Sequence, residues 1–180
     1  MVAPEPRLET DRLILRLPEA RDFDAWAAFA ADEEAARYLG GAQSRPAAWR
    51  GMAQMTGAWR LRGFSMFSVE EKATGRWVGR VGPWQPEAWP GTEVGWGIVR
   101  ERWGQGYAAE AAVVAIDWAF ATFGWDEVIH CIDPENANSQ AVAKKLGSTL
   151  LRRTRLPAPF DHMEVDVWGQ SRDQWMARRR

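Results

Sequence analysis

Residues 93–110 read EVGWGIVRERWGQGYAAE, and this stretch decides the fold. Residues 93–99 predict a strand, and the chain from Tyr107 stays apolar through Phe123, which predicts a helix after a glycine-bearing turn. Unpaired N–H groups and the positive end of the helix dipole attract anions at such a helix start. Small residues here let a phosphate approach the backbone without meeting side chains: Gly104, Gly106, Ala108 and Ala109. The stretch therefore predicts a pyrophosphate-binding turn.

The composition predicts one soluble domain without a polyanionic partner. The chain has 180 residues, of which 46% are hydrophobic, so it can bury one substantial core and needs no second domain. We therefore expect a single domain over residues 1–180. The formal net charge of -1 gives no global basic field, which disfavours nucleic acid as a partner.

Cysteine, histidine and hydropathy patterns exclude several other classes of site. Cys131 is the single cysteine, so disulfide and thiolate-zinc frameworks are excluded and a reducing compartment is favoured. His130 and His162 lie in separate segments, so a metal site lacks obvious ligands. Residues 1–6 lack a charged head followed by an apolar stretch, and no apolar run approaches membrane-spanning length. We expect a cytoplasmic protein with no metal and no membrane contact.

The order of predicted elements indicates an α/β fold. Strands are predicted at 12–17, 64–69, 76–81, 93–99, 128–132, 148–155 and 163–168, and helices at 21–38, 46–61, 107–123 and 138–146. An antiparallel meander thus leads into one strand-helix-strand unit. This mixture predicts a single central mixed, mostly antiparallel seven-stranded sheet with helices on both faces.

A rival cofactor motif overlaps the glycine turn. Gly104-x-Gly106-x-x-Ala109 satisfies the dinucleotide fingerprint, and Asp133 follows the next strand as a ribose ligand would. However, a dinucleotide fold places this motif after its first strand, whereas several strands precede it here. A Walker-type loop is excluded because no Gly-Lys-Ser/Thr follows the glycines.

Four segments, taken in order, resemble the GNAT superfamily of acyl-CoA-dependent N-acyltransferases, and most closely its RimJ/RimL branch. They are 8–16, 93–96, 103–111, and 136–139 followed by 145–147. The resemblance runs from about Leu8 to Trp175. The family's phosphate motif, Q/R-x-x-G-x-G/A, places Trp103 at its first position, Gly106 at its fourth and Ala108 at its sixth. Trp103 departs from the general pattern, although an aromatic residue is frequent there in the Rim-like branch.

The resemblance implies acetyl-CoA as cofactor. Amides of the glycine turn would hold the pyrophosphate, and the pantetheine arm would lie between the strands at 93–99 and 128–132. The cofactor-binding residues implied are Trp96, Gly97, Ile98, Val99, Trp103, Gly104, Gln105, Gly106, Tyr107, Ala108, Ala109, Asn136, Ser139 and Lys144. Arg100, Arg102, Lys144 and Lys145 are candidate partners of the ribose phosphate, or solvated side chains.

The resemblance also implies catalytic residues for amine acetylation. Glu93 is the candidate base, or a sheet-end carboxylate; burial beside tryptophans would raise its pKa toward the working range. Ser139 would protonate the thiolate and Asn136 would orient the cofactor, although both residue types also favour helix caps. A backbone N–H near Trp96 or Gly97 would polarise the thioester, with the flanking glycines permitting a bulge or a close approach.

Other aromatic and polar residues near these segments receive structural interpretations or remain open. Trp84 and Trp89, in a proline-rich loop, would wall the acceptor site or pack as core. His130 shares a strand face with Val128 and Ile132 and is interpreted as a packed residue, while Cys131 faces the opposite way.

The leading hypothesis is an acetyl-CoA-dependent N-acetyltransferase that transfers acetyl directly from the thioester to a primary amine. The acceptor would be a protein N-terminal amine or a small-molecule amine, and a homodimer stays open. The first alternative is a non-catalytic acyl-CoA sensor or adaptor; the second is an NAD(P)-binding protein. The fold does not decide the acceptor.

Overall fold

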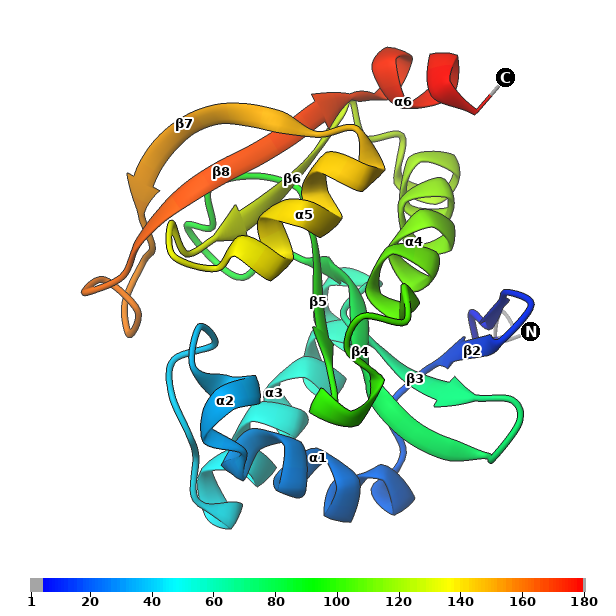
Figure 1. Ribbon diagram of the computed structural model, residues 1–180, viewed down its shortest axis with the longest axis vertical. Helices are drawn as coiled ribbons and strands as arrows, with labels where there is room; N and C mark the ends of the chain where they lie inside the picture. Colours follow the sequence, from blue (N-terminus) through cyan, green and yellow to red (C-terminus); the bar gives the residue numbers. More distant parts are fainter. Residues whose placement is uncertain (1–4, 180) are drawn as a thin grey trace.

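One open sheet runs through the molecule in the order β1-β2-β3-β4-β5-β6-β8-β7, in a computed structural model that describes residues 5–179 (Figure 1). The expectation about residues 1–6, that they lack a charged head followed by an apolar stretch, falls mostly on residues 1–4, which lie outside the described residues. The strands are β1 Leu8–Glu9, β2 Leu13–Arg16, β3 Phe67–Glu71, β4 Arg76–Trp84, β5 Glu93–Ile98, β6 Glu127–Ile132, β7 Thr149–Arg155 and β8 Glu164–Ser171. All neighbours pair antiparallel except β5 and β6, which pair parallel.

The prediction of a mixed, mostly antiparallel sheet is confirmed, with eight strands among residues 5–179 in place of seven. The additional strand, β1, pairs Leu8 with Leu15 and Glu9 with Ile14. Two residues are too few to display a period-two pattern, so this strand has no signal in the sequence.

Helices cover both faces of the sheet, as expected. They are α1 Phe23–Ala31, α2 Glu33–Ala36, α3 Arg45–Arg62, α4 Tyr107–Phe123, α5 Ala137–Leu146 and α6 Arg172–Arg178, with 3-10 turns η1 Ala20–Asp22 and η2 Arg100–Arg102. On one face, α4 buries Ala112 and Ile116 against apolar side chains of β2 to β6. On the other, α1 and α3 pack around Trp26 and Trp77.

The predicted helix 21–38 is wrong in extent, because the chain breaks into η1, α1 and α2. Asp32 causes the second break: its extended backbone ends α1, and its carboxylate accepts from the N–H groups of Glu34 and Ala35 to start α2. Gly63 and Gly124, both left-handed, end α3 and α4.

Two further boundaries differ from the sequence prediction. β4 continues through Pro83 to Trp84, so Trp84 lies at a strand end and not in a loop. Pro83 is tolerated because β3 stops pairing at Val81, which leaves this part of β4 at a sheet edge on one side. The unpredicted α6 has a capping box from Ser171 and Gln174, and it buries Trp175 in the main core.

Candidate active site

The glycine turn leads directly into the start of α4, where backbone N–H groups can bind an anion. Gly106 is the N-cap of α4 and has φ 81°, a left-handed conformation that favours glycine. No side chain caps this end, and the first-turn N–H groups of Tyr107, Ala108 and Ala109 have no acceptor within residues 5–179. Because the first turn carries little side-chain bulk apart from buried Tyr107, these donors are accessible to a phosphate.

Charged side chains brace this turn from behind. Glu71, buried at the end of β3, accepts from Arg102 at 2.8 and 3.0 Å and from the Tyr107 hydroxyl at 2.6 Å. These bonds, Arg102 first, lower the pKa of Glu71 to about 2, and the bond to Glu71 raises the pKa of Tyr107. Arg12 donates to the Gln105 carbonyl at 3.0 Å and pairs with Glu110. Tyr107 and Arg102 thus hold the turn in place with groups already committed to Glu71.

A cleft of about 550 Å³ opens from this turn toward α5. The residues expected to bind the cofactor that line it are Trp96, Gly97, Ile98, Trp103, Gly104, Gly106, Tyr107, Ala108, Ala109, Asn136 and Ser139. Three others do not line it. Val99 packs against the core, Gln105 presents its carbonyl to Arg12, and Lys144 lies with its amine 5.4 Å from the Trp168 ring.

Lysine side chains of α5 divide between two surfaces. Lys145 lines the cleft, and its amine would lie 3.9 Å from a Cβ placed on Gly106. Successive helical residues point about 100° apart, so Lys144 and Lys145 cannot face the same surface. Lys145 is therefore the α5 cation beside the glycine turn, while Arg100 pairs with Asp32.

β5 and β6 separate just where the pantetheine arm is expected. Their parallel pairing is limited to Glu93 opposite Ile129. Beyond that point, His130 fills the gap: its Nδ1 lies 2.7 Å from the Val94 carbonyl, and its ring packs 4.8 Å from that of Trp96. Trp96 Nε1 in turn donates to Ser139 Oγ at 3.2 Å, which ties β5 to α5.

His130 is a neutral structural residue, in agreement with its interpretation as a packed side chain. It is 1% exposed, and burial lowers its pKa to about 4. Nδ1 must carry the proton because its partner is a carbonyl, so Nε2 accepts from the Ser148 hydroxyl at 3.0 Å. This tautomer fixes the distance between the separated strands.

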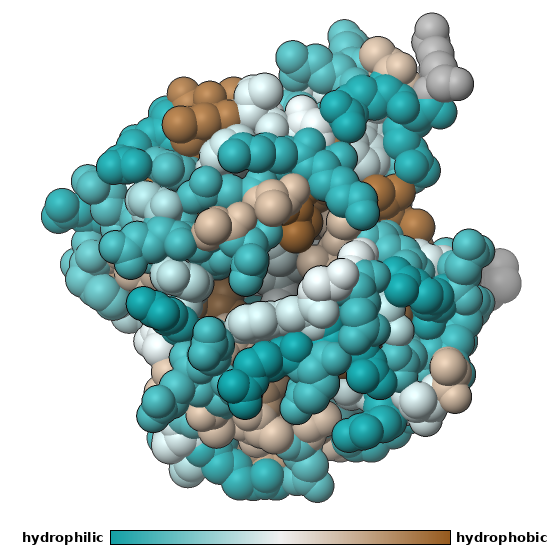
Figure 2. Space-filling model, viewed as in Figure 1, coloured by the Kyte–Doolittle hydropathy of each residue, from teal (hydrophilic) through white to brown (hydrophobic). Residues whose placement is uncertain are grey.

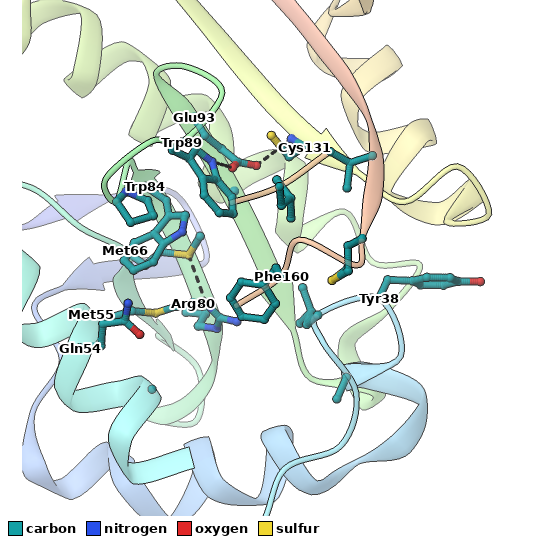
Figure 3. Close-up of a pocket in the computed structure, with 18 of the residues that line it drawn as sticks. Tyr38, Gln54, Met55, Met66, Arg80, Trp84, Trp89, Glu93, Cys131 and Phe160 are labelled. Carbon is teal, nitrogen blue, oxygen red and sulfur yellow. Dashed lines mark hydrogen bonds between the residues drawn. The ribbon is translucent and has the colours of Figure 1, made fainter. Parts of the chain in front are cut away.

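A second cavity, of about 560 Å³, adjoins the first and is lined by residues of α1, α3, β4 and β5. Glu93, the candidate base, lines it together with Trp84 and Trp89, the candidate walls of the acceptor site (Figure 3). Gly95 of β5 lines it, and β5 is closely packed here: a Cβ on Gly95 would lie 2.7 Å from Met66 Cε, and one on Gly97 would lie 2.9 Å from Phe29 Cζ. β4 and β5 pair without a register shift, so the bulge considered near Trp96 is absent and the glycines serve close packing.

Glu93 is a buried carboxylate with few compensating charges. It is 6% exposed, and burial raises its pKa to about 7. Its Oε1 accepts from the Cys131 backbone N–H at 2.8 Å and its Oε2 accepts from the Trp89 indole, which partly offset the effect of burial. A carboxyl group with this pKa can exchange a proton near neutral pH.

The two α5 residues of the candidate site have separable roles. Asn136 is the N-cap of α5, and its side chain accepts from the Ser139 N–H at 3.0 Å. Ser139 itself caps nothing with its hydroxyl, which accepts only the Trp96 indole among the described residues. The hydroxyl proton of Ser139 is therefore available to a group in the cleft.

The two cavities meet at one place. Both are lined by Trp96, Asn136 and Ser139, and by Tyr38 and Leu39 from the segment after α2. Figure 2 shows the hollow, with apolar residues at its floor and a polar rim. A molecule in one cavity can therefore touch a molecule in the other only beside Trp96 and Ser139.

Several lining residues had no sequence signal that pointed to this site. Arg80 lies in β4, Met66 precedes β3, and Phe160 belongs to the loop between β7 and β8. For Arg80, the one signal that could have indicated it is a charged residue inside an otherwise apolar strand. Within residues 5–179 no cluster of acidic, histidine and cysteine residues could hold a metal ion, and no helix is long and apolar enough to cross a membrane.

Comparisons with known proteins agree with this geometry. Residues 12–149 match the family model described as an acetyltransferase (GNAT) domain. YkkB of Bacillus subtilis (strain 168) is 31% identical over 152 residues, which cover 78% of this chain and 84% of the relative. The N-acetyltransferase p20 of Bacillus licheniformis is 30% identical over 135 residues, which cover 73% of this chain and 76% of the relative.

Solved structures include acetyltransferases of the same architecture. The acetyltransferase from Agrobacterium tumefaciens str. C58 has a TM-score of 0.82 and 30% identity, over 94% of this chain and 96% of that one. Mycobacterium smegmatis RimJ in complex with CoA-disulfide has a TM-score of 0.69 and 18% identity, over 90% and 83% of the two chains. At the latter identity the likeness extends to the fold.

Proposed function

Because the chain belongs to the GNAT acetyltransferase family, we propose that it is an acetyl-CoA-dependent N-acetyltransferase that acetylates a primary amine by direct attack on the thioester. The observation that carries the proposal is the meeting of the two cavities beside Trp96 and Ser139. One cavity begins at an anion-binding helix start and the other contains a carboxylate of raised pKa.

The phosphate-binding turn fits a CoA pyrophosphate. Free N–H groups of Tyr107, Ala108 and Ala109, the dipole of α4 and the nearby amine of Lys145 all favour negative charge at the same spot. Acetyl-CoA supplies a thioester carbonyl that an uncharged amine can attack. The separated edges of β5 and β6 support the placement of its extended arm there.

Glu93 is proposed as the group that takes a proton from the acceptor amine. A free α-amine has a pKa near 8 and a lysine amine about 10.4, so at neutral pH most of either is charged. A carboxylate with a pKa of about 7 can accept such a proton directly or through water. Ser139 is proposed to return a proton to the departing thiolate, because its hydroxyl proton has no other acceptor within the described residues.

Calorimetric titration tests the proposal. The purified protein is titrated with acetyl-CoA and, separately, with NADH and NADPH, and thiol release is then followed with amines present. Saturable acetyl-CoA binding and amine-dependent CoA release are expected. Binding without release for any amine would favour the acyl-CoA sensor, and binding of nicotinamide cofactors alone would refute the proposal.

A further inference from the structure

Arg80 is a cation without a carboxylate partner in the acceptor cavity. It lies in the middle of β4 and lines this cavity (Figure 3). Its Nη1 lies 3.1 Å from Met55 Sδ and 3.7 Å from Met66 Sδ, and its guanidinium is 5.5 Å from the Trp26 ring. Within residues 5–179 no carboxylate comes within ion-pair distance of it.

The other enclosed arginine shows how the chain normally satisfies this side chain. Arg16 donates to both oxygens of Asp22 at 2.7 and 2.8 Å and also to Glu70. Arg80 has five N–H donors as well, yet its described partners are sulfur atoms, which are weak acceptors. Burial lowers the pKa of Arg80 to about 10, so it is still charged at neutral pH. A guanidinium that lines a cavity without a carboxylate partner favours an anion that enters it.

The cavity places this cation on the same face as the candidate base. Arg80 pairs with Gly97, and Trp84 pairs with Glu93, so the two charged groups lie four positions apart along the strands. That spacing is about 13 Å between their backbones. Gly95 lines the cavity between them, where an added Cβ would lie 2.7 Å from Met66 Cε. The cavity therefore offers an anion site at Arg80 that is separate from the candidate base.

The walls of the cavity are apolar and largely aromatic. They include Trp26, Phe29, Trp84, Trp89 and Phe160. Rings of this kind bury an apolar side chain, while a few polar groups fix its orientation. A single enclosed guanidinium matches one carboxylate in charge, and it can donate two parallel N–H bonds to the two carboxylate oxygens.

We infer that the acceptor is an amino acid with an apolar or aromatic side chain, whose carboxylate binds Arg80 and whose amine reaches the junction beside Trp96 and Ser139. The inference rests on the proposed acetyltransferase function and narrows its acceptor to a carboxylated small amine. In the reaction, the amine nitrogen forms the amide bond with the acetyl carbon, the carbon–sulfur bond of the thioester breaks, and one amine proton passes through water to Glu93 while the thiolate takes up a proton. Arg80 is a substrate-binding residue and takes no part in proton transfer.

The test compares amino acids with their amides. Phenylalanine, tryptophan, tyrosine, leucine and methionine are each assayed beside the corresponding amino-acid amide, and kcat/KM is measured from CoA release. We expect at least one acid to exceed its amide by about 100-fold or more, because a site built to bond a group rejects the analogue lacking it. The inference would be overturned if the amides are acetylated as well as the acids, if peptides with free N-termini are preferred over the acids, or if no acid is acetylated.

Variants locate the effect at Arg80. Arg80→Met keeps the length of the side chain and removes its charge, and it should reduce the acid-to-amide ratio to about one. Arg80→Lys keeps the charge and should restore part of the ratio, which also separates binding from a folding defect. Arg76→Met makes the same substitution at the exposed start of β4 and should leave the ratio unchanged. An acid-to-amide ratio that survives in Arg80→Met would overturn the role of Arg80.

Failure of this inference is distinguishable from failure of the proposed function. Acetyl-CoA affinity is measured by calorimetry for the wild type and each variant, and it should not change, because Arg80 does not line the cofactor cleft. Acetyl-CoA binding with acetylation of uncharged amines would retain the enzyme and refute the amino-acid acceptor. Absence of acetyl-CoA binding would refute both.

Discussion

Replacing Glu93 with glutamine should move activity and stability in opposite directions at alkaline pH. The carboxylate is 6% exposed, and its pKa is raised from 4.5 to about 7 by burial. The folded state therefore holds this proton more tightly than the unfolded state does. The resulting contribution to folding is fully present below pH 4.5 and is lost as the pH rises through 7.

The size of the stability effect follows from the two pKa values. Between pH 5 and pH 8, linkage predicts that wild type loses about 2.5 kcal/mol of unfolding free energy relative to Glu93→Gln. Glutamine leaves one of two donors, the Cys131 N–H or the Trp89 indole, without a carboxylate acceptor, which costs about 1–3 kcal/mol. That cost does not depend on pH, so it shifts the whole plot of unfolding free energy against pH without changing its slope.

Urea denaturation at several pH values, followed by tryptophan fluorescence, measures this difference. The same two proteins are compared in kcat at saturating amine, where the ratio of wild type to variant cancels the amine's own ionisation. A base with a pKa of about 7 is about one-tenth ionised at pH 6 and nine-tenths at pH 8, so the ratio should rise about tenfold. At pH 8 the variant should be slower by about 10² to 10⁴.

Two further variants control the interpretation. Trp89→Phe removes a bond that lowers the pKa of Glu93, so both midpoints should move to higher pH. Glu127→Gln alters an exposed carboxylate at the start of β6 and should leave both curves unchanged. Stability curves that run parallel for wild type and Glu93→Gln would show that burial does not perturb this carboxylate. A constant kcat ratio would refute its role as base.

Three other substitutions test the remaining parts of the site. Gly106→Val should abolish acetyl-CoA binding measured by calorimetry, and tight binding by this variant would refute the phosphate-binding turn. The control is Gly63→Val, which also changes a left-handed glycine but lies far from the cleft; it should strain the chain by a similar ~1–2 kcal/mol and leave binding intact. Ser139→Ala should lower turnover by about 10² or more with acetyl-CoA affinity nearly retained, and unchanged turnover would leave this hydroxyl no role beyond its bond to Trp96. Wild type should lose stability below pH 6.5, by about 3 kcal/mol near pH 4, because the pKa of His130 in the folded state is lowered to about 4; His130→Gln should remove this loss. If urea denaturation shows the same decrease in unfolding free energy at acid pH for both proteins, the neutral, buried state of His130 is contradicted.

Local signals predicted most of the fold. The helix at 107–123 and the turn before it were foreseen because glycine conformation and helix periodicity act within a few residues. The predicted helix 21–38 failed because one capping side chain, Asp32, restarts the helix more favourably than the backbone continues it. α6 escaped prediction because its stability depends on Trp175, which packs against a core assembled from distant elements.

The candidate site was predicted in part, and these assignments stay predictions until they are measured. Residues beside the glycine turn line the cleft, as their sequence proximity implied. On α5 the sequence favoured Lys144 for the cofactor, while the structure directs Lys145 to the cleft and Lys144 to Trp168. The choice between adjacent residues depends on helix phase, which is set by packing and not by composition.

The order of elements, the anion-binding turn and the family follow from the sequence alone, because each depends on neighbouring residues or on matched segments in a fixed order. The environment of Arg80 was decided by tertiary structure. Simple alternation along β4 would place Arg80 on the face of Val78 and away from Trp77. The register shift opposite Val69 and Glu70 leaves Val78 as an extra residue, so Trp77 and Arg80 come to the same face, over the acceptor cavity. Strand register depends on pairing between residues far apart in the chain, and the sequence pattern of one strand does not contain it.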